Sequence, residues 1–211
     1  MPDRAVLFID GNNWFHYVRD CGITGSGDLN YAKISKKLIG PAREWIATRY
    51  YIGRVNQGEA PEHYAAQRRF LSKLCAPDQR ISTHLGRLES RRVKNALAME
   101  VKQYLANLKV RIDRKVYTDL VRMAEARSVE VVVGEKAVDV HLAVDMVIMA
   151  ERDQYDAAYL LSADGDFTPA VDAVRSLGKR VYAASPGTGA QLAAAVNTFI
   201  PLNATWFADC W

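Results

Sequence analysis

The sequence is poor in cysteine and histidine, the residues that build disulfide frameworks and most zinc sites. Its three cysteines, Cys21, Cys75 and Cys210, are an odd number without a Cys-x-x-Cys pair. The four histidines are His16, His63, His84 and His141, and they lack metal-ligand spacing. We therefore expect neither a disulfide framework nor a zinc site, and we expect each histidine on the surface or hydrogen-bonded in the core.

Long apolar runs are absent as well. No segment approaches the roughly 20 apolar residues that cross a bilayer, and the apolar run after Arg4 is too short for a signal peptide. The 211 residues are 49% hydrophobic and 25% charged, a composition that suits a globular protein with a sizeable core. We expect a cytoplasmic protein with no membrane partner.

Charge of one sign is not in large excess, since 28 basic residues face 24 acidic ones. The basic residues nevertheless gather in three stretches: Arg49, Arg54, Arg68, Arg69 and Lys73; Arg87, Arg91, Arg92 and Lys94; Arg111, Arg114 and Lys115. Tyr50 and Tyr51 lie within the first stretch, and aromatic rings among cations suit single-stranded nucleic acid. Solvated basic faces with two tyrosines in the core are an equally open interpretation.

Short β-branched runs alternate with longer helical patterns, which is typical of βαβ units around a largely parallel sheet. The expected strands are 4–10, 48–55, 80–88, 129–133, 157–161 and 180–184. Residues 89–128 are rich in charge, have a mainly helical pattern and fit no simple βαβ step. Because we find neither a linker nor an internal repeat, we predict a single domain over 1–211 with a helical insertion at 89–128.

Carboxylates follow two of these strands. "FIDGNN" ends the first strand with Asp10 and continues to Asn13, and "LLSADGDF" places Asp164 and Asp166 after a later strand. In an open parallel sheet, ligands bind beyond the carboxyl ends of the strands, where the strand order reverses. If the two strands are neighbours, these side chains converge. Asp-Gly-Asp alone is a common turn, so the prediction depends on both motifs occurring together.

A third contribution comes from "EKAVDVHLAVDM", which predicts a buried helix that is apolar almost all round. Asp139 falls in its first turn, where the helix dipole favours an anion. Asp145 lies roughly 120° further around the axis, so the two carboxylates point in different directions. A lone buried carboxylate is costly, and Asp145 should therefore reach the rim of the cluster or hold a basic side chain.

Carboxylates that are brought together repel one another unless a cation lies between them. Oxygen ligands without cysteine or histidine suit Mg²⁺ or Mn²⁺, and such ions activate water and neutralise phosphate charge. The set of motifs therefore predicts hydrolysis of phosphodiesters.

Three blocks of the sequence resemble the NYN domain family, the LabA-like branch of the PIN-like nucleases: "FIDGNN", "EKAVDVHLAVDMV" and "LLSADGDFTPAVDAVRSLGKRVYA". Residues 89–128 have no counterpart in the family's pattern. The resemblance implies a three-layer α/β/α fold whose mainly parallel sheet has the strand order 3-2-1-4-5, with the first and fourth strands side by side. It also implies a metal-dependent endoribonuclease that uses Mg²⁺ or Mn²⁺ and has RNA, expected to be single-stranded, as its partner.

The resemblance also assigns roles to individual residues. Catalytic and metal-binding roles would belong to Asp10, Asp139, Asp164 and Asp166, and substrate contacts to Asn13, Ser162 and Lys136, with Asp145 as a secondary candidate. Asn13 would orient Asp10 or the scissile phosphate, and Ser162 would hydrogen-bond beside the acidic pair. Lys136 would contact phosphate or be an ordinary surface lysine at a helix start.

Two alternatives stay open. The first is an RNA- or protein-binding regulatory module with a vestigial acidic site, in which the 89–128 arm or the aromatic C-terminal tail docks a protein partner or a second copy of the chain. The four carboxylates argue against it, because a pure binder gains nothing from repelling charges. The second is a phosphatase, a Toprim-like enzyme or a P-loop protein. The chain has Asn12 and Asp10 where the first two need Asp and Glu, and "ASPGTGAQ" lacks the Walker lysine.

Overall fold

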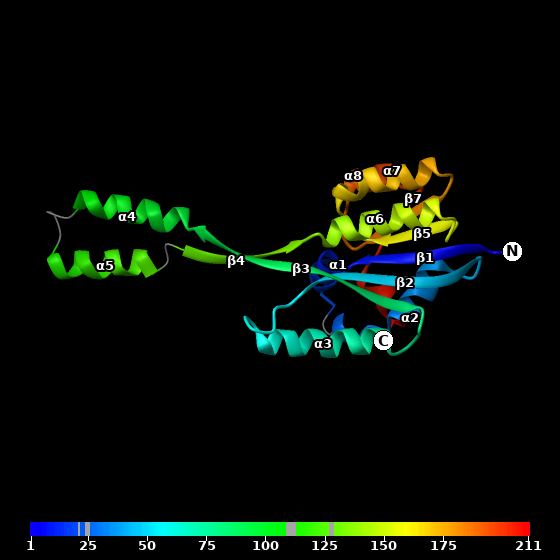
Figure 1. Cartoon of the computed structure of the whole chain (residues 1–211), viewed down its shortest axis with the longest axis horizontal. Coiled ribbons are helices and arrows are strands. Elements are labelled where there is room, and N and C mark those ends of the chain that lie inside the picture. The colour runs from blue at the N-terminus through cyan, green and yellow to red at the C-terminus, as the bar shows by residue number, and fades with distance from the viewer. Residues whose placement is uncertain (21, 24–25, 109–112, 127–128) are drawn as a thin grey trace. The chain divides into compact units, whose positions relative to one another are not determined.

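The computed structural model describes residues 1–20, 22–23, 26–108, 113–126 and 129–211. Its strands are β1 (Asp3–Asp10), β2 (Arg43–Arg54), β3 (Ile81–Lys94), β4 (Val129–Lys136), β5 (Ala157–Leu161), β6 (Arg180–Ser185) and β7 (Thr198–Pro201). Its α-helices are α1 (Gly11–Asp20), α2 (Tyr31–Ile39), α3 (Pro61–Cys75), α4 (Ala96–Leu108), α5 (Arg114–Ala126), α6 (Val138–Glu151), α7 (Thr168–Ser176) and α8 (Ala190–Ala195). Helices and strands thus alternate along most of the chain (Figure 1).

The sheet has the order β4-β3-β2-β1-β5-β6-β7. Within this order the six neighbouring strands β3-β2-β1-β5-β6-β7 pair in parallel. The predicted order 3-2-1-4-5 is confirmed for the parallel strands, with β7 as one further strand at the edge. β1 and β5 are neighbours, so the chain reverses its direction of winding between them. That reversal is where an open α/β sheet forms a binding crevice.

The central strand β1 is buried on both faces, as expected of a parallel sheet covered by helices. Ala5, Leu7 and Ile9 pack with α1 and α2 in one core, whereas Val6 and Phe8 pack with α6 and α7 in the other. The alternation follows from the two-residue period of a strand. Two apolar cores on opposite faces of one sheet give the predicted three-layer α/β/α architecture.

The chain divides into two compact units. Unit 1 holds 1–87 and 136–211, with the parallel sheet, and unit 2 holds Leu88–Glu135. The predicted insertion at 89–128 falls inside unit 2 and contains α4 and α5, but its first residues, up to Lys94, belong to β3. The expected strand at 129–133 is part of β4, beside β3, rather than the fourth strand of the parallel sheet.

Helices α4 and α5 of unit 2 contact each other and expose apolar side chains. These are Leu97, Met99, Val101 and Tyr104 on α4, and Val116, Leu120 and Met123 on α5. The prediction that this arm binds a partner stays a prediction.

The C-terminal aromatic tail is mostly part of the core. Phe207 is buried against Trp14, and Trp206 packs on the same cluster, so of the three tail aromatics only Trp211 is exposed. Phe207 is thus unavailable to a partner, whereas docking through the partly exposed Trp206 and the exposed Trp211 stays a prediction. Within the described ranges, none of the helices has the length and apolarity that crossing a membrane requires.

Candidate active site

The carboxylates after β1 and β5 meet at the carboxyl edge of the sheet. Ile9 of β1 is in register with Leu161 of β5, so Asp10 and the residues that follow Leu161 leave the sheet at the same level. Asp10 is 1% exposed, Asp164 is half-buried and Asp166 is exposed. The convergence that the two sequence motifs suggested is therefore present in the structure.

Asn13 and Ser162 hold Asp10 in place. The Asn13 Nδ2 group donates to Asp10 Oδ2 at 2.6 Å and lies 3.4 Å from Asp164 Oδ2, so one amide bridges the two carboxylates. Ser162 Oγ donates to Asp10 Oδ2 at 3.1 Å and accepts from the Asp164 backbone N–H at 3.1 Å. Both side chains therefore orient the acidic groups. The family resemblance suggested such hydrogen bonds for Asn13 and Ser162.

The turns after the two strands also depend on their aspartates. Asp164 Oδ1 accepts from the Asp166 backbone N–H at 2.9 Å and so caps the short 3₁₀ turn Gly165–Phe167. The Asn13 backbone N–H donates to Asp10 Oδ1 at 3.4 Å, where α1 begins. Each loop therefore fixes the direction of the carboxylate that precedes it.

Burial and neighbouring charge raise the pKa of two of the four carboxylates, Asp10 and Asp139. Burial, and then the charge of Asp139, raise the pKa of Asp10 to about 6. Burial, and then the charges of Asp164 and Asp166, raise the pKa of Asp139, which lies in the first turn of α6 as predicted. Among the described residues, no lysine, arginine or histidine forms a salt bridge with any of the four. The cluster thus concentrates negative charge without a counter-ion from the described part of the chain.

The raised pKa of Asp10 predicts how the metal-free protein responds to pH. The folded state binds a proton at Asp10 more tightly than the unfolded chain, whose pKa is 3.8. The ionised side chain therefore costs stability that grows as the pH rises from about 4 to about 6, by up to about 3 kcal/mol. We expect Asp10→Asn to be more stable than wild type at pH 7 in EDTA, by urea denaturation, and close to it at pH 4.

Asp156→Asn is the matched control, because hydrogen bonds from Arg4 lower the pKa of Asp156 to about 2. This variant should lose stability at pH 7 rather than gain it. If Asp10→Asn were also less stable than wild type at pH 7, Asp10 would be an ordinary structural carboxylate.

Asp145 belongs to a different polar group, over β2 and β3. Its Oδ2 accepts from Arg49 at 2.7 Å and from the Tyr51 hydroxyl at 2.8 Å. The sequence left two positions open for Asp145, at the rim of the acidic cluster or beside a basic side chain. The structure supports the second, because Asp145 pairs with Arg49.

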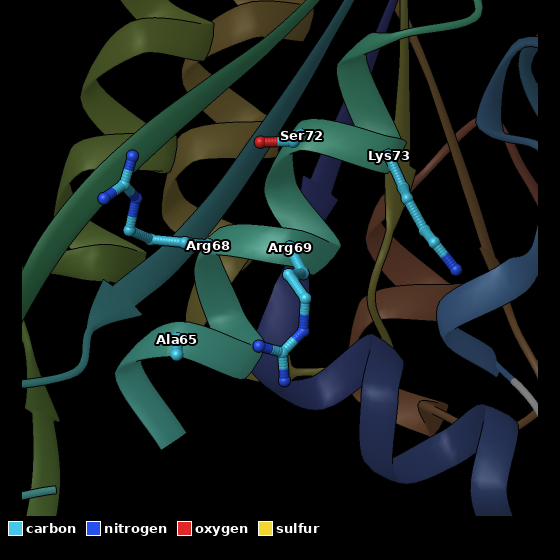
Figure 2. Close-up of a pocket in the computed structure, with 5 residues that line it drawn as sticks. All are labelled: Ala65, Arg68, Arg69, Ser72 and Lys73. Carbon is cyan, nitrogen blue, oxygen red and sulfur yellow. The ribbon is translucent and has the colours of Figure 1, made fainter. Parts of the chain in front are cut away.

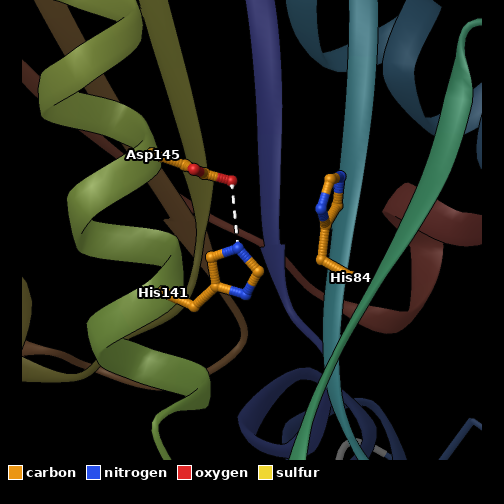
Figure 3. A group of neighbouring side chains, drawn as sticks. All are labelled: His84, His141 and Asp145. Atoms are coloured by element: carbon orange, nitrogen blue, oxygen red, sulfur yellow. Dashed lines mark ion pairs between the residues drawn. The ribbon is translucent and has the colours of Figure 1, made fainter.

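His84 and His141 lie beside Asp145, and the three residues offer ligand atoms within 4.8 Å of one another (Figure 3). This group could not be predicted from the sequence, because His84 lies on β3 and the other two residues lie on α6, far away along the chain. Arg49 already lies here, 2.7 Å from Asp145 and 3.5 Å from His84 Nδ1, and a metal ion would have to displace its guanidinium. Burial, and then the charge of Arg49, lower the pKa of His84 to about 4, so the ring is neutral near pH 7. We interpret the group as a partly buried ion pair between Arg49 and Asp145 with its polar neighbours.

The interpretation of Tyr50 and Tyr51 changes, whereas that of Lys136 stays a prediction. Tyr50 and Tyr51 are 1% and 0% exposed, so they are core residues, and the interpretation that they stack on a base is wrong. The reason is that β2 is a central strand, covered on both faces. Lys136 ends β4, one residue before the left-handed Ala137 that precedes α6, and its side chain lies outside the described part of the structure.

Comparison with known proteins agrees with the fold. The sequence model of the NYN domain family matches residues 4–203. A crystal structure of a protein of unknown function from Vibrio parahaemolyticus superposes with a TM-score of 0.55 and 14% identity, covering 96% of this chain and 94% of that chain. At this identity the likeness supports the fold alone. No curated protein is similar enough in sequence to match.

Proposed function

The chain belongs to the NYN domain family of PIN-like nucleases, and from this we propose that it is a metal-dependent endoribonuclease that hydrolyses single-stranded RNA. The observation that carries the proposal is the acidic cluster of Asp10, Asp139, Asp164 and Asp166. Neighbouring carboxylates raise the pKa of Asp10 and of Asp139, which makes the cluster a poor structural element, whereas a divalent cation would neutralise its charge.

The residues of the cluster fit a hard metal ion. All four offer carboxylate oxygens, the ligands that Mg²⁺ and Mn²⁺ prefer, and neither cysteine nor histidine belongs to the set. The buried Asp10 would be the inner ligand, with the half-buried Asp164 and the more exposed Asp139 and Asp166 around it. When bound, such an ion lowers the pKa of a water molecule and neutralises charge on a phosphate.

The chain's own neutral side chains would keep this site in order. Asn13 links Asp10 to Asp164, and Ser162 donates to the same Asp10 Oδ2 atom as Asn13, so the two side chains together fix the orientation of the Asp10 carboxylate. In the proposed reaction, water adds to phosphorus, and the bond from phosphorus to the 3′-oxygen breaks. The products are a 5′-phosphate and a 3′-hydroxyl.

The proposed mechanism is tested by identifying the ends of the cleavage products and the group that attacks phosphorus. The cleavage position in a labelled RNA is first mapped, and the same RNA is then made with a single 2′-deoxynucleotide on the 5′ side of that bond. We expect cleavage to persist with a 5′-phosphate product, because water and not the 2′-hydroxyl attacks, and to stop in EDTA. Loss of cleavage in the substituted RNA together with 2′,3′-cyclic phosphate ends in the unmodified one would refute this mechanism.

A further inference from the structure

Two arginines stand side by side at the carboxyl edge of the sheet without an acidic partner. Arg54 of β2 is in register with Arg87 of β3, and both side chains are exposed. Neither forms a salt bridge or a hydrogen bond with another described residue. Like charges on adjacent strands repel, and an anion between them would remove that repulsion.

Most other arginines that leave the strands of unit 1 are paired with carboxylates. The pairs are Arg4 with Asp156, Arg43 with Asp3, Arg49 with Asp145 and Arg180 with Asp3. Pairing is thus the usual arrangement for a strand arginine in this unit. Arg54 and Arg87 depart from it at the edge where the acidic cluster lies.

Helix α3 adds further cations and a hollow beside them. A hollow of about 300 Å³ lies between α3 and the strands, lined by Arg54, Tyr64, Arg68 and Leu85 among others. Along α3 a second hollow of about 490 Å³ shares Arg68 and is also lined by Arg69 and Lys73. Figure 2 shows Arg68, Arg69 and Lys73 leaving α3 in three directions. Lys73 reaches Asp28 at 3.0 Å, whereas Arg68 and Arg69 have no described acidic partner.

Tyr64 is an aromatic residue that lines the first hollow. Its side chain is half-buried, and its hydroxyl has no hydrogen-bond partner among the residues that the structure describes. Leu85, which is 37% exposed, adds an apolar surface opposite the cations. A ring beside unpaired arginines is how proteins hold single-stranded nucleic acids, with bases stacked and phosphates paired.

The hollow lies close to the acidic cluster. Asp10 is in register with Tyr51, and Arg54 follows three residues further along β2. With about 3.3 Å per residue and about 4.8 Å between strands, the Cα atoms of Asp10 and Arg54 are roughly 11 Å apart. The Asp10 side chain follows the face of Phe8, which packs with α6, whereas Arg54 follows the face of Tyr50 on the α3 side, so a strand bound at both would cross the carboxyl edge of the sheet.

We propose that the α3 groove, lined by Arg54, Tyr64 and Arg68 and flanked by Arg69 and Arg87, binds phosphates and one base of the single-stranded RNA that crosses this edge of the sheet. The inference rests on the proposed function for the nature of the ligand. The arginines pair with phosphates, and the Tyr64 ring stacks on the base.

Binding without cleavage tests the groove. Fluorescence anisotropy of a short labelled oligouridylate in EDTA compares wild type with Arg54→Gln/Arg68→Gln over a range of salt concentrations. We expect the double variant to bind about tenfold more weakly, with the slope of log affinity against log salt smaller by about 1.4, because each lost phosphate contact removes about 0.7. Tyr64→Leu should weaken binding at least about fivefold, and Tyr64→Phe, which keeps the ring, should not.

The single variant Arg68→Gln is measured as well, with Arg152→Gln as its matched control, because Arg152 is an exposed arginine at the far end of α6. Unchanged affinity and slope in the groove variants, or an equal loss in Arg152→Gln and Arg68→Gln, would overturn the proposal. Asp164→Asn separates the two hypotheses, because in EDTA it should bind RNA at least as tightly as wild type, having lost one negative charge, and with metal it should fail to cut RNA. If Asp164→Asn cuts normally, the proposed function fails, while binding in EDTA still decides the groove.

Discussion

Replacement of Asp10 by asparagine is expected to slow RNA cleavage by about 10²–10³-fold, although the same variant should be more stable than wild type without metal. Asparagine keeps the size of the side chain and an oxygen that can accept from Asn13 and Ser162. It removes only the charge that a divalent ion requires. Opposite effects on stability and activity are typical of a carboxylate kept for function at a cost to the fold.

Initial rates with Mn²⁺ check this expectation, beside Asp172→Asn as the matched control. Asp172 is exposed on α7 and forms no salt bridge among the described residues, so its loss should leave the rate within about twofold of wild type. Equal rates for Asp10→Asn and Asp172→Asn would remove Asp10 from the site.

Gly11→Ala is expected to cause the largest loss of stability, about 3 kcal/mol or more in the free energy of unfolding. A Cβ atom at this position would lie 2.4 Å from a ring carbon of Tyr50 and 2.6 Å from the Tyr51 carbonyl oxygen. Tyr50 is buried, and the carbonyl belongs to the central strand β2, so neither can move without disturbing the sheet. The residue that starts α1 after Asp10 must therefore be glycine for steric reasons.

Urea denaturation in EDTA measures the effect, with Gly27→Ala as the control. A Cβ at Gly27 would meet only a Phe70 ring carbon at 3.8 Å, an ordinary contact, so that variant should change stability by less than about 1 kcal/mol. Similar midpoints for the two variants would show that the contact of Gly11 with β2 is not a constraint.

The convergence of the acidic residues could be predicted because each motif is local. "FIDGNN" and "LLSADGDF" each show a buried strand that is followed by a carboxylate. The carboxylates converge once the two strands are neighbours in the sheet, as β1 and β5 are. Periodicity alone did not give that order, which came from the family resemblance. The position of Asp139 in the first turn of α6 could also be predicted, because it is the one acidic residue at the start of an otherwise apolar helical pattern.

Features that depend on pairing between distant segments could not be predicted in this way. The pairing of Asp145 with Arg49, and the approach of His84 to both, join α6 to β2 and β3. The burial of Tyr50 and Tyr51 follows from the position of β2 inside the sheet, which the charged residues at its two ends and at Arg49 do not reveal. The register that puts Arg54 beside Arg87 is likewise a property of the assembled sheet.

The central claim is that the acidic cluster holds a divalent cation and cuts RNA, and one side-by-side assay tests it most directly. Wild type and Asp164→Asn, purified in parallel, are incubated with labelled single-stranded RNA in Mg²⁺, in Mn²⁺ and in EDTA. The account predicts cleavage by wild type with metal, none in EDTA, and none by the variant under any condition. Equal cleavage by both proteins, or wild-type cleavage that EDTA leaves unchanged, would contradict it.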